Sequence, residues 1–254
     1  YFDVLDLGDQ PQVGGFRNEA VLLSYLGRLE YNFDDRYLIN AVIRRDGSSR
    51  FSEENKWGNF PSVSLAWRLS NESFFNSNLI DDLKIRASYG ELGSGNIGYY
   101  EYMGFINTFG AAVFGRDQNL QPSATQVRLA NEQLRWEVLK QTNFGVDLEL
   151  LERSILITAD YFVARTEDVL FGFPILWTSG NDGGNPISNA ATVENRGFEI
   201  DLTYRRALGD LDFQTSLNLT TLRNELIPLG NEFNESIQGN TITQAGEPVG
   251  MWYV

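Results

Sequence analysis

The sequence contains neither cysteine nor histidine among its 254 residues. It therefore has no disulfide, thiolate nucleophile, imidazole base or Cys/His metal site. Adjacent carboxylates such as Glu53 and Glu54 would point to opposite sides of a strand, so they form no catalytic pair. We expect no enzyme activity, no cofactor and no bound metal.

Long apolar runs and basic residues are also scarce. No segment approaches the roughly 18 to 20 apolar residues of a membrane-spanning helix, and the first residues are not a signal peptide. We therefore exclude a helical membrane protein and expect a mature chain, a domain or a fragment. The 34 acidic residues outnumber the 20 basic ones and give a net charge of −14. This charge repels phosphate backbones, so nucleic acid is not an expected partner.

Apolar and polar residues alternate with a period of two, which is the pattern of strands with one apolar face. In residues 62–69, for example, Val63, Leu65 and Trp67 share one face, and serines and Arg68 share the other. The pattern predicts eight strands, at residues 23–33, 37–45, 62–69, 83–90, 136–150, 155–165, 197–204 and 211–220. A tilted strand needs about 9 to 11 residues to cross a bilayer, which most of these segments supply.

The connections between the predicted strands alternate between short and long. Short turns occupy residues 34–36, 151–153 and 207–210, and long loops occupy residues 46–59, 92–135, 166–195 and those after 222. Outer-membrane barrels have short periplasmic turns and long extracellular loops in this way, although residues 70–82 depart from the rule. The predicted fold class is all-β: an antiparallel transmembrane β-barrel segment of about eight long strands.

Alternation alone also fits a soluble sandwich, whose apolar face would meet a second sheet. Aromatic residues favour the barrel because they fall into two belts on the apolar face, as at membrane interfaces. The belt near the short turns holds Tyr31, Phe33, Tyr37, Trp67 and Tyr204, and the belt near the long loops holds Tyr89, Trp136 and Tyr161. The alternative is a soluble or surface-exposed β-sandwich module that binds carbohydrate without transport.

A series of short motifs runs along the chain in one order. The first half contains Arg-Asp-Gly-Ser-Ser-Arg-Phe at residues 45–51, Asn-Lys-Trp-Gly at 55–58, Phe-Pro-Ser-Val-Ser-Leu-Ala-Trp-Arg at 60–68, Glu-Ser-Phe-Phe at 72–75 and Asp-Asp-Leu-Lys-Ile-Arg-Ala-Ser-Tyr-Gly at 81–90. The second half contains Leu-Arg-Trp-Glu at residues 134–137, then Gln141, Asn143, Gly145 and Asp147, Asp-Tyr-Phe at 160–162 and Asn-Arg-Gly-Phe-Glu at 195–199. Together they resemble the SusC-like (SusC/RagA) branch of the TonB-dependent outer-membrane transporters.

The resemblance implies TonB-dependent active import of a nutrient, a glycan oligosaccharide or a peptide, across the outer membrane of a Gram-negative bacterium. Such transporters have about 22 strands and a plug in the lumen. Residues 1–254 would then be part of the barrel domain, without the plug domain and the remaining strands. The implied partners are outer-membrane lipid, a SusD-like surface lipoprotein, the substrate, and a TonB-type energy-coupling protein that acts through the missing N-terminal part.

Charged residues on the polar side of the predicted strands would face the lumen of such a barrel. They are Arg28, Glu30, Arg44, Arg68, Lys84, Arg86, Asp147, Glu149, Glu199 and Asp201. They could line the substrate path or hold the plug, but we favour cross-strand ion pairs for most of them.

The long loops carry aromatic, amide and carboxylate side chains that could stack on and hydrogen-bond a sugar ring. The candidate substrate-binding residues are Tyr99, Tyr100, Trp177, Asn181 and Asp182, with packing of loop on loop as the alternative. For the loop after Arg45 we favour a structural role, in which Asp46 caps local amides and Arg50 pairs with a carboxylate such as Glu53.

Overall fold

The computed structural model describes residues 17–116, 118–172, 175–179, 181, 185–209, 211–228, 235–238 and 240–252. Long strands dominate it: β1 (Leu22–Phe33), β2 (Tyr37–Ser48), β3 (Trp57–Arg68), β4 (Ile80–Ser94), β7 (Glu137–Leu150), β8 (Ile155–Gly172), β9 (Ile187–Leu208) and β10 (Leu211–Pro228). The remaining elements are β5 (Phe105–Phe114), β6 (Asn119–Arg128), β11 (Glu235–Gln238), β12 (Thr241–Gln244), β13 (Met251–Trp252) and the short 3₁₀ helices η2 (Leu69–Asn71) and η3 (Trp177–Ser179). No helix in the described part of the chain is long and apolar enough to cross a membrane.

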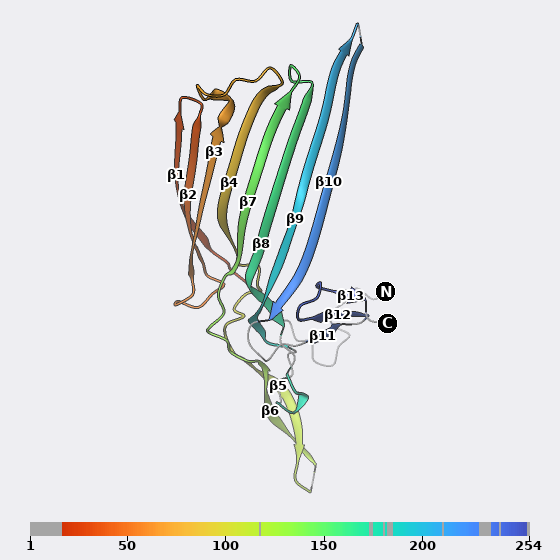
Figure 1. Cartoon of the computed structure of the whole chain (residues 1–254). Helices are drawn as coiled ribbons and strands as arrows, with labels where there is room; N and C mark the ends of the chain where they lie inside the picture. Colours follow the sequence, from red (N-terminus) through yellow and green to blue (C-terminus); the bar gives the residue numbers. More distant parts are fainter. Residues whose placement is uncertain are drawn as a thin grey trace, which may run out of the picture.

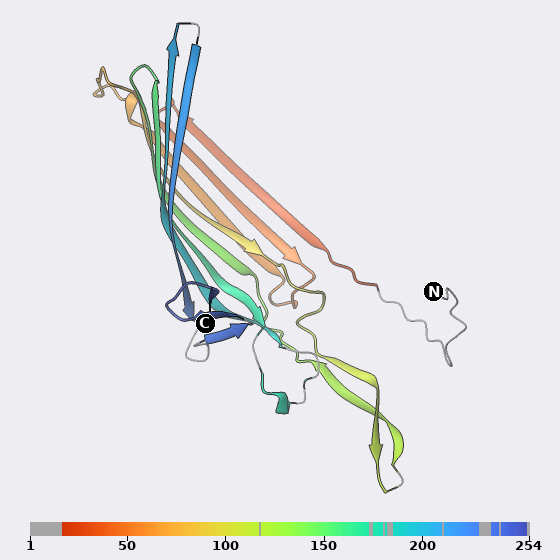
Figure 2. The ribbon, with the colours of Figure 1, turned by 90° about the vertical axis from the view of Figure 1, so that its right-hand side faces the viewer.

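The eight long strands form one open antiparallel sheet in the order β1-β2-β3-β4-β7-β8-β9-β10 (Figure 1). Each of these strands pairs with the next long strand along the chain, with β5 and β6 left out between β4 and β7, and β1 and β10 are the two edges. The strands at the edges run at a clear angle to each other, as the usual twist of a sheet requires (Figure 2). All eight predicted strands and the predicted fold class are confirmed.

Most strands run further toward the loop end than the alternation predicts. The clearest case is β9, which extends over 22 residues although the pattern covers only residues 197–204. Its additional residues include Glu194 and Arg196, which interrupt the apolar series but keep their pairing with β8 and β10. The prediction missed β5 and β6, which form a separate hairpin inside the expected loop at residues 92–135 and project beyond the sheet (Figure 1).

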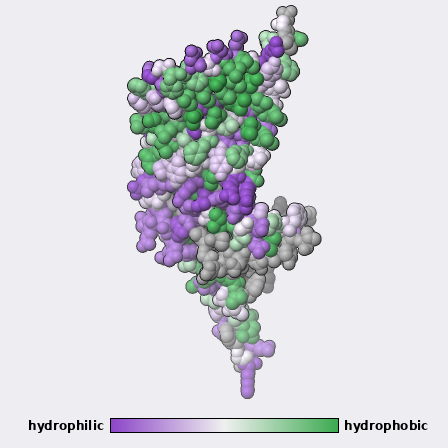
Figure 3. Space-filling model, in the orientation of Figure 1, coloured by the Kyte–Doolittle hydropathy of each residue, from purple (hydrophilic) through white to green (hydrophobic). Residues whose placement is uncertain are grey.

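The two faces of the sheet differ in chemistry, because cross-strand register aligns side chains of one kind. The apolar face carries Leu29, Ile39, Val63, Leu65, Ile85, Phe144, Val146, Phe198, Ile200, Leu202, Leu217 and Leu219, all exposed. Leu217, for example, is 65% exposed. Figure 3 shows a broad hydrophobic area over the long strands, which we call the apolar band. Within the described residues no second sheet covers the band, so the arrangement that a sandwich requires is absent there.

Tight turns close the end of the sheet opposite the long loops. Asp34 and Asp35, the central residues of the turn between β1 and β2, have φ values of 58° and 52°. Between β7 and β8 the central residues are Glu152 and Arg153, with φ values of 55° and 61°. Two successive residues in the left-handed region characterise the turn type whose twist matches that of antiparallel strands. The short turns predicted at these two places are therefore confirmed.

Aromatic side chains gather at the turn end of the apolar face, as predicted. Neighbouring ring centroids lie 6.5 Å apart between Tyr31 and Phe33, 6.3 Å apart between Phe33 and Tyr37, and 6.3 Å apart between Tyr37 and Trp67. At the loop end, Tyr89 and Tyr161 lie on the apolar face, but the prediction for Trp136 is wrong. Trp136 is buried, because it precedes β7 and packs into the base of the loops.

A carboxylate outside the strands anchors the row of rings. Glu72, in the connection after η2, accepts hydrogen bonds from the Tyr37 hydroxyl at 2.7 Å and from the Trp67 indole at 2.9 Å. These bonds, together with Arg36, stabilise the charged form, so the pKa of Glu72 lies below its usual value. The row of rings is thus fixed to the turn that follows β3.

Candidate functional site

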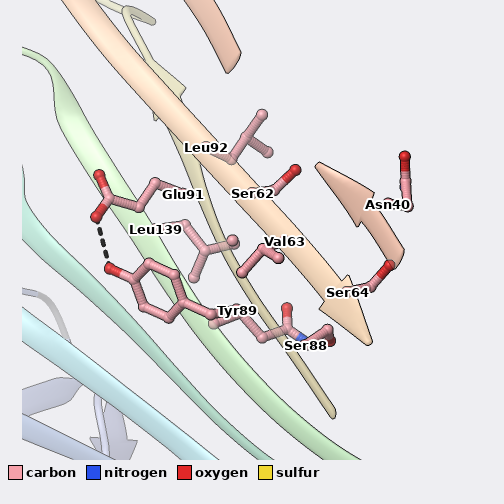
Figure 4. Close-up of a pocket in the computed structure, with 11 residues that line it drawn as sticks. Asn40, Ser62, Val63, Ser64, Ser88, Tyr89, Glu91, Leu92 and Leu139 are labelled. Carbon is pink, nitrogen blue, oxygen red and sulfur yellow. Dashed lines mark hydrogen bonds between the residues drawn. The ribbon is translucent and has the colours of Figure 1, made fainter. Parts of the chain in front are cut away.

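The polar face of the sheet carries a row of small uncharged side chains. Cross-strand pairing aligns Asn40 with Ser64, Ser64 with Ser88, and Ser88 with Asn143, so the row crosses β2, β3, β4 and β7. These residues line a hollow of about 540 Å³. Figure 4 shows Asn40, Ser64 and Ser88 beside an adjoining pocket that Ser62 and Tyr89 also line. The row provides hydroxyl and amide groups that can exchange hydrogen bonds with water or a polar ligand.

A network of charges lies next to this row. Asp147 accepts from Arg86 at 2.9 and 3.0 Å and lies 2.7 Å from the ammonium of Lys84. Arg86 also donates to Asp160 on β8 at 3.0 Å, although β7 lies between the two strands. Gly145 makes this contact possible, because a Cβ at that position would overlap Asp160 and lie 2.7 Å from the Arg86 guanidinium. One arginine therefore holds carboxylates from two strands.

The ten charged residues predicted to face a lumen all lie on this polar face. Besides the Arg86 network, the ion pairs among them are Arg28 with Glu30, Arg44 with Asp46 at 2.8 Å, Arg68 with Asp82 at 3.4 Å, and Glu149 with Arg153 at 3.1 Å. Glu199 and Asp201 are exposed on the same face. Sequence reasoning missed Asp82 and Asp160 as partners, because their pairing depends on the register between strands.

A compact hydrophobic cluster forms the base of the long loops. Its buried members are Phe51, Phe60, Ile97, Leu134 and Trp136. The ring of Trp136 lies 5.0 Å from that of Phe51 and 5.5 Å from that of Phe60, and its indole donates to the Lys56 carbonyl at 3.2 Å. These residues come from three segments that are distant in sequence. We call this cluster the loop platform.

Glycines make room for the aromatic side chains of the loop platform. A Cβ at Gly58 or Gly93 would overlap the Phe60 ring, and a Cβ at Gly95 would lie 3.1 Å from Phe51. Such close approach of backbone to ring leaves no space for any larger residue. Packing therefore explains Gly58 in the motif at residues 55–58.

The loop after Arg45 has the structural role that we favoured, but with different partners. Arg50 donates to the Ile97 carbonyl at 2.8 Å, whereas Glu53 pairs with Lys56 at 2.5 Å. The predicted pair of Arg50 with Glu53 is therefore wrong. Asp46 accepts from the Arg44 side chain at 2.8 Å, so its observed partner is a guanidinium and not a local amide.

A second junction fixes the end of β8 to the loop platform. Arg135 makes a two-pronged bond to Asp168, at 2.8 and 2.6 Å, and these bonds raise the pKa of the guanidinium further. Asn189 donates to the carbonyls of Arg135 and Asp168 at 3.0 and 2.7 Å. Asp168 has a φ of 56°, at a point where the register between β8 and β9 shifts. Arg135 thus joins the start of β7 to an irregular segment of β8.

The five candidate substrate-binding residues are placed unequally. Tyr99 and Tyr100 follow β4; the Arg50 guanidinium lies 5.2 Å from the Tyr99 ring centroid, and Arg128 donates to the Tyr100 carbonyl at 3.2 Å. Asn181 is a buried residue just after η3. The side chain of Trp177 and the whole of Asp182 lie outside the described residues. Tyr99 is the most exposed of the described members, with 40% of its surface accessible.

This combination, an open antiparallel sheet with an exposed apolar face, a charged polar face and packed loops at one end, defines a section of the wall of a plugged or water-filled barrel. Residues 5–249 match the family described as TonB dependent receptor-like, beta-barrel. The chain belongs to this family of TonB-dependent receptor β-barrels.

Individual relatives agree with this assignment. The chain is 36% identical over 234 residues to TonB-dependent receptor P39 of Formosa agariphila, which covers 91% of this chain and 22% of that protein. It is 33% identical over 220 residues to TonB-dependent receptor SusC of Bacteroides thetaiotaomicron, a match that covers 84% of this chain and 22% of that protein. The predicted resemblance to SusC-like transporters is confirmed. The chain spans about a quarter or less of the length of these relatives.

Solved structures show the same architecture. The RagAB peptide importer in its open-open state superposes with a TM-score of 0.82 at 25% identity, covering 97% of this chain and 27% of that one. The closed-closed state gives a TM-score of 0.78 at 26% identity, covering 91% and 25%. The sheet therefore has the shape of part of a much larger importer.

Proposed function

We propose that this chain forms part of the barrel wall of a TonB-dependent importer in the outer membrane of a Gram-negative bacterium. The observation that carries the proposal is the division of the sheet into an exposed apolar face and a charged polar face, in a sheet that superposes on the RagAB importer. An apolar outer face is stable against lipid, whereas the hydroxyls, amides and ion pairs of the polar face are stable in water. No residue of this wall performs covalent chemistry.

The polar face would line the lumen and contact a plug domain encoded outside residues 1–254. Oδ1 of Asp160 and Oδ1 of Asn143 are buried and make no hydrogen bond within the described part of the chain. Buried polar atoms normally have partners, so these acceptors are suited to a donor from the plug or from lumenal water. A TonB-type protein would act on that plug, and the path past the row from Asn40 to Asn143 would open.

The loops would capture the nutrient above the lumen, together with a SusD-like surface lipoprotein. Tyr99 and Tyr100, with Trp177, Asn181 and Asp182, would contact the substrate. The exposed ring of Tyr99 could stack on a sugar ring or a peptide side chain. The solved relative is titled a peptide importer, which supports a peptide as the substrate. A glycan oligosaccharide stands beside it, as the resemblance to SusC-like transporters implies.

Uptake by the full-length protein that carries this segment tests the proposal. The protein is expressed in a host without its own copy, and entry of labelled oligosaccharide and peptide pools is compared with the TonB-type partner present and deleted. We expect entry of one pool to depend on both the importer and the partner. Equal entry in all strains would exclude energy-coupled import.

A further inference from the structure

A belt of charged residues crosses the apolar face at its loop end. It consists of Glu91 on β4, Lys140 on β7, Arg165 and Glu167 on β8, Glu194 and Arg196 on β9, and Arg223 and Glu225 on β10. We call it the outer charge belt. Each belt residue lies an even number of positions from an apolar-face residue of its strand: Arg196, for example, is two residues from Phe198. Figure 3 shows a hydrophilic zone next to the apolar band.

The belt residues form ion pairs both across strands and along them, and only the pairs of Lys140 with Glu167, Arg165 with Glu194 and Arg196 with Glu225 join two strands. Lys140 lies 2.5 Å from Glu167, Arg165 lies 2.6 Å from Glu194, and Arg223 lies 3.6 Å from Glu225. Arg196 connects two of these pairs, at 3.6 Å from Glu194 and 4.0 Å from Glu225. The belt is thus a fixed array of side chains.

The cations of the belt are more exposed than most of their partners. The side chain of Arg165 is 48% exposed and that of Glu194 only 10%, and the values for Arg223 and Glu225 are 67% and 30%. The guanidinium groups are therefore more accessible to solvent than the carboxylates that hold them. The belt has four basic and four acidic residues, but its three arginines are more exposed than the glutamates that they pair with.

Aromatic residues adjoin the belt where the apolar band ends. The Tyr89 hydroxyl donates to Glu91 at 2.5 Å, and on β2 the Arg45 guanidinium lies 5.0 Å from the Trp57 ring centroid (Figure 4 shows Tyr89 and Glu91). Tyr and Trp mark the boundary between hydrocarbon and head groups in membrane barrels. The belt therefore lies at the level of lipid head groups when the apolar band lies in hydrocarbon.

We propose that the outer charge belt binds the phosphate groups of lipid head groups in the surrounding leaflet, with Arg165, Arg196 and Arg223 as the main contacts. Guanidinium groups recognise phosphate by paired N–H donors, and partners that already hold them reduce the entropy lost on binding. The inference rests on the membrane placement of the proposed function, but it is independent of transport.

Reconstitution of the full-length protein with a phosphorylated glycolipid tests the inference. The protein is inserted into phosphatidylcholine vesicles that contain either bisphosphorylated lipid A or its dephosphorylated form, and the glycolipid retained after detergent extraction is counted by native mass spectrometry. The variant is Arg165→Gln/Arg196→Gln/Arg223→Gln. The matched control is Arg153→Gln/Arg205→Gln/Arg206→Gln, three exposed arginines at the turn end of the sheet.

We expect retention of bisphosphorylated lipid A to fall by about tenfold or more in the belt variant, since each basic residue near a surface contributes to binding of anionic lipid. The control variant should retain as much bisphosphorylated lipid A as the wild type. The dephosphorylated lipid should be retained equally by the wild type and both variants. If the triple variant does not insert, Arg223→Gln alone, the most exposed position, should still reduce retention. Inorganic phosphate should not displace the lipid.

Three results would overturn the inference, and they separate the lipid site from the membrane placement. If the protein inserts and the belt variant retains as much lipid A as the wild type, or if inorganic phosphate displaces the lipid completely, the belt is not a lipid site and the membrane placement stands. If the wild-type protein does not insert into any vesicle, the membrane placement fails and the lipid site fails with it.

Discussion

Removal of the Trp136 side chain should loosen the loops without opening the sheet. Trp136 is 7% exposed, packs on Phe51 and Phe60, and donates to the Lys56 carbonyl. Replacing a buried tryptophan by alanine costs about 3–5 kcal/mol, because the cavity that remains is only partly refilled. At 1.4 kcal/mol for each factor of ten, the population of opened loop platform should rise roughly a hundredfold or more.

Limited proteolysis of the full-length protein in micelles measures this population, because cleavage of an opening segment follows the fraction that is open. We expect Trp136→Ala to be cleaved in the loops at least tens of times faster than the wild type, in keeping with that estimate. The matched control is Trp252→Ala, at a tryptophan that is 78% exposed. Equal cleavage rates in the two variants would refute the structural role of the loop platform.

Three other perturbations have defined outcomes. Arg135→Lys cannot keep the two-pronged bond to Asp168, so a protease should cleave the segment after β8 faster than in the wild type. The control variant Arg116→Lys, at an exposed position, should be cleaved at the wild-type rate. Equal cleavage of the two variants would show that the bond from Arg135 to Asp168 does not hold this segment. Because the pKa of Glu72 is lowered in the folded chain, its contribution to stability is present above its usual value near 4.5 and is lost as pH falls through the folded-state pKa. As the pH falls below 4.5, tryptophan fluorescence in micelles should therefore change in the wild type and not in Glu72→Gln. A change at the same pH in both proteins would show that protonation of Glu72 is not its cause. The isolated 254-residue chain exposes two sheet edges and the apolar band, so circular dichroism should show folded β structure only in micelles; a soluble folded monomer in buffer would contradict this.

The sequence predicts the long strands well because one physical requirement governs them. An apolar surface on one side and a polar one on the other enforces period two, and Val63, Leu65 and Trp67 follow it without interruption. The charged residues of the polar face follow from the same alternation. The alternation does not predict where the strands end, because β9 continues through Glu194 and Arg196, which lie on the apolar face beyond the apolar band.

Features that depend on cross-strand register lie beyond the reach of a single sequence. Gly145 permits the bond from Arg86 to Asp160 only because the three residues align on adjacent strands. From the sequence, Trp136 is predicted to be an interfacial aromatic residue, but Phe51 and Phe60, which are distant in sequence, bury it. The β5–β6 hairpin pairs only with itself, and its register shifts twice, so no regular alternation marks it.

Labelling of single cysteines tests the central claim, that the apolar face meets lipid and the polar face meets water. The chain has no cysteine, so Ser62→Cys, Val63→Cys, Ser64→Cys and Leu65→Cys can be introduced one at a time into the full-length protein in vesicles. We expect a membrane-impermeant thiol reagent, added with access to the lumen, to label positions 62 and 64 and to spare 63 and 65. Labelling of all four positions at similar rates would contradict the account.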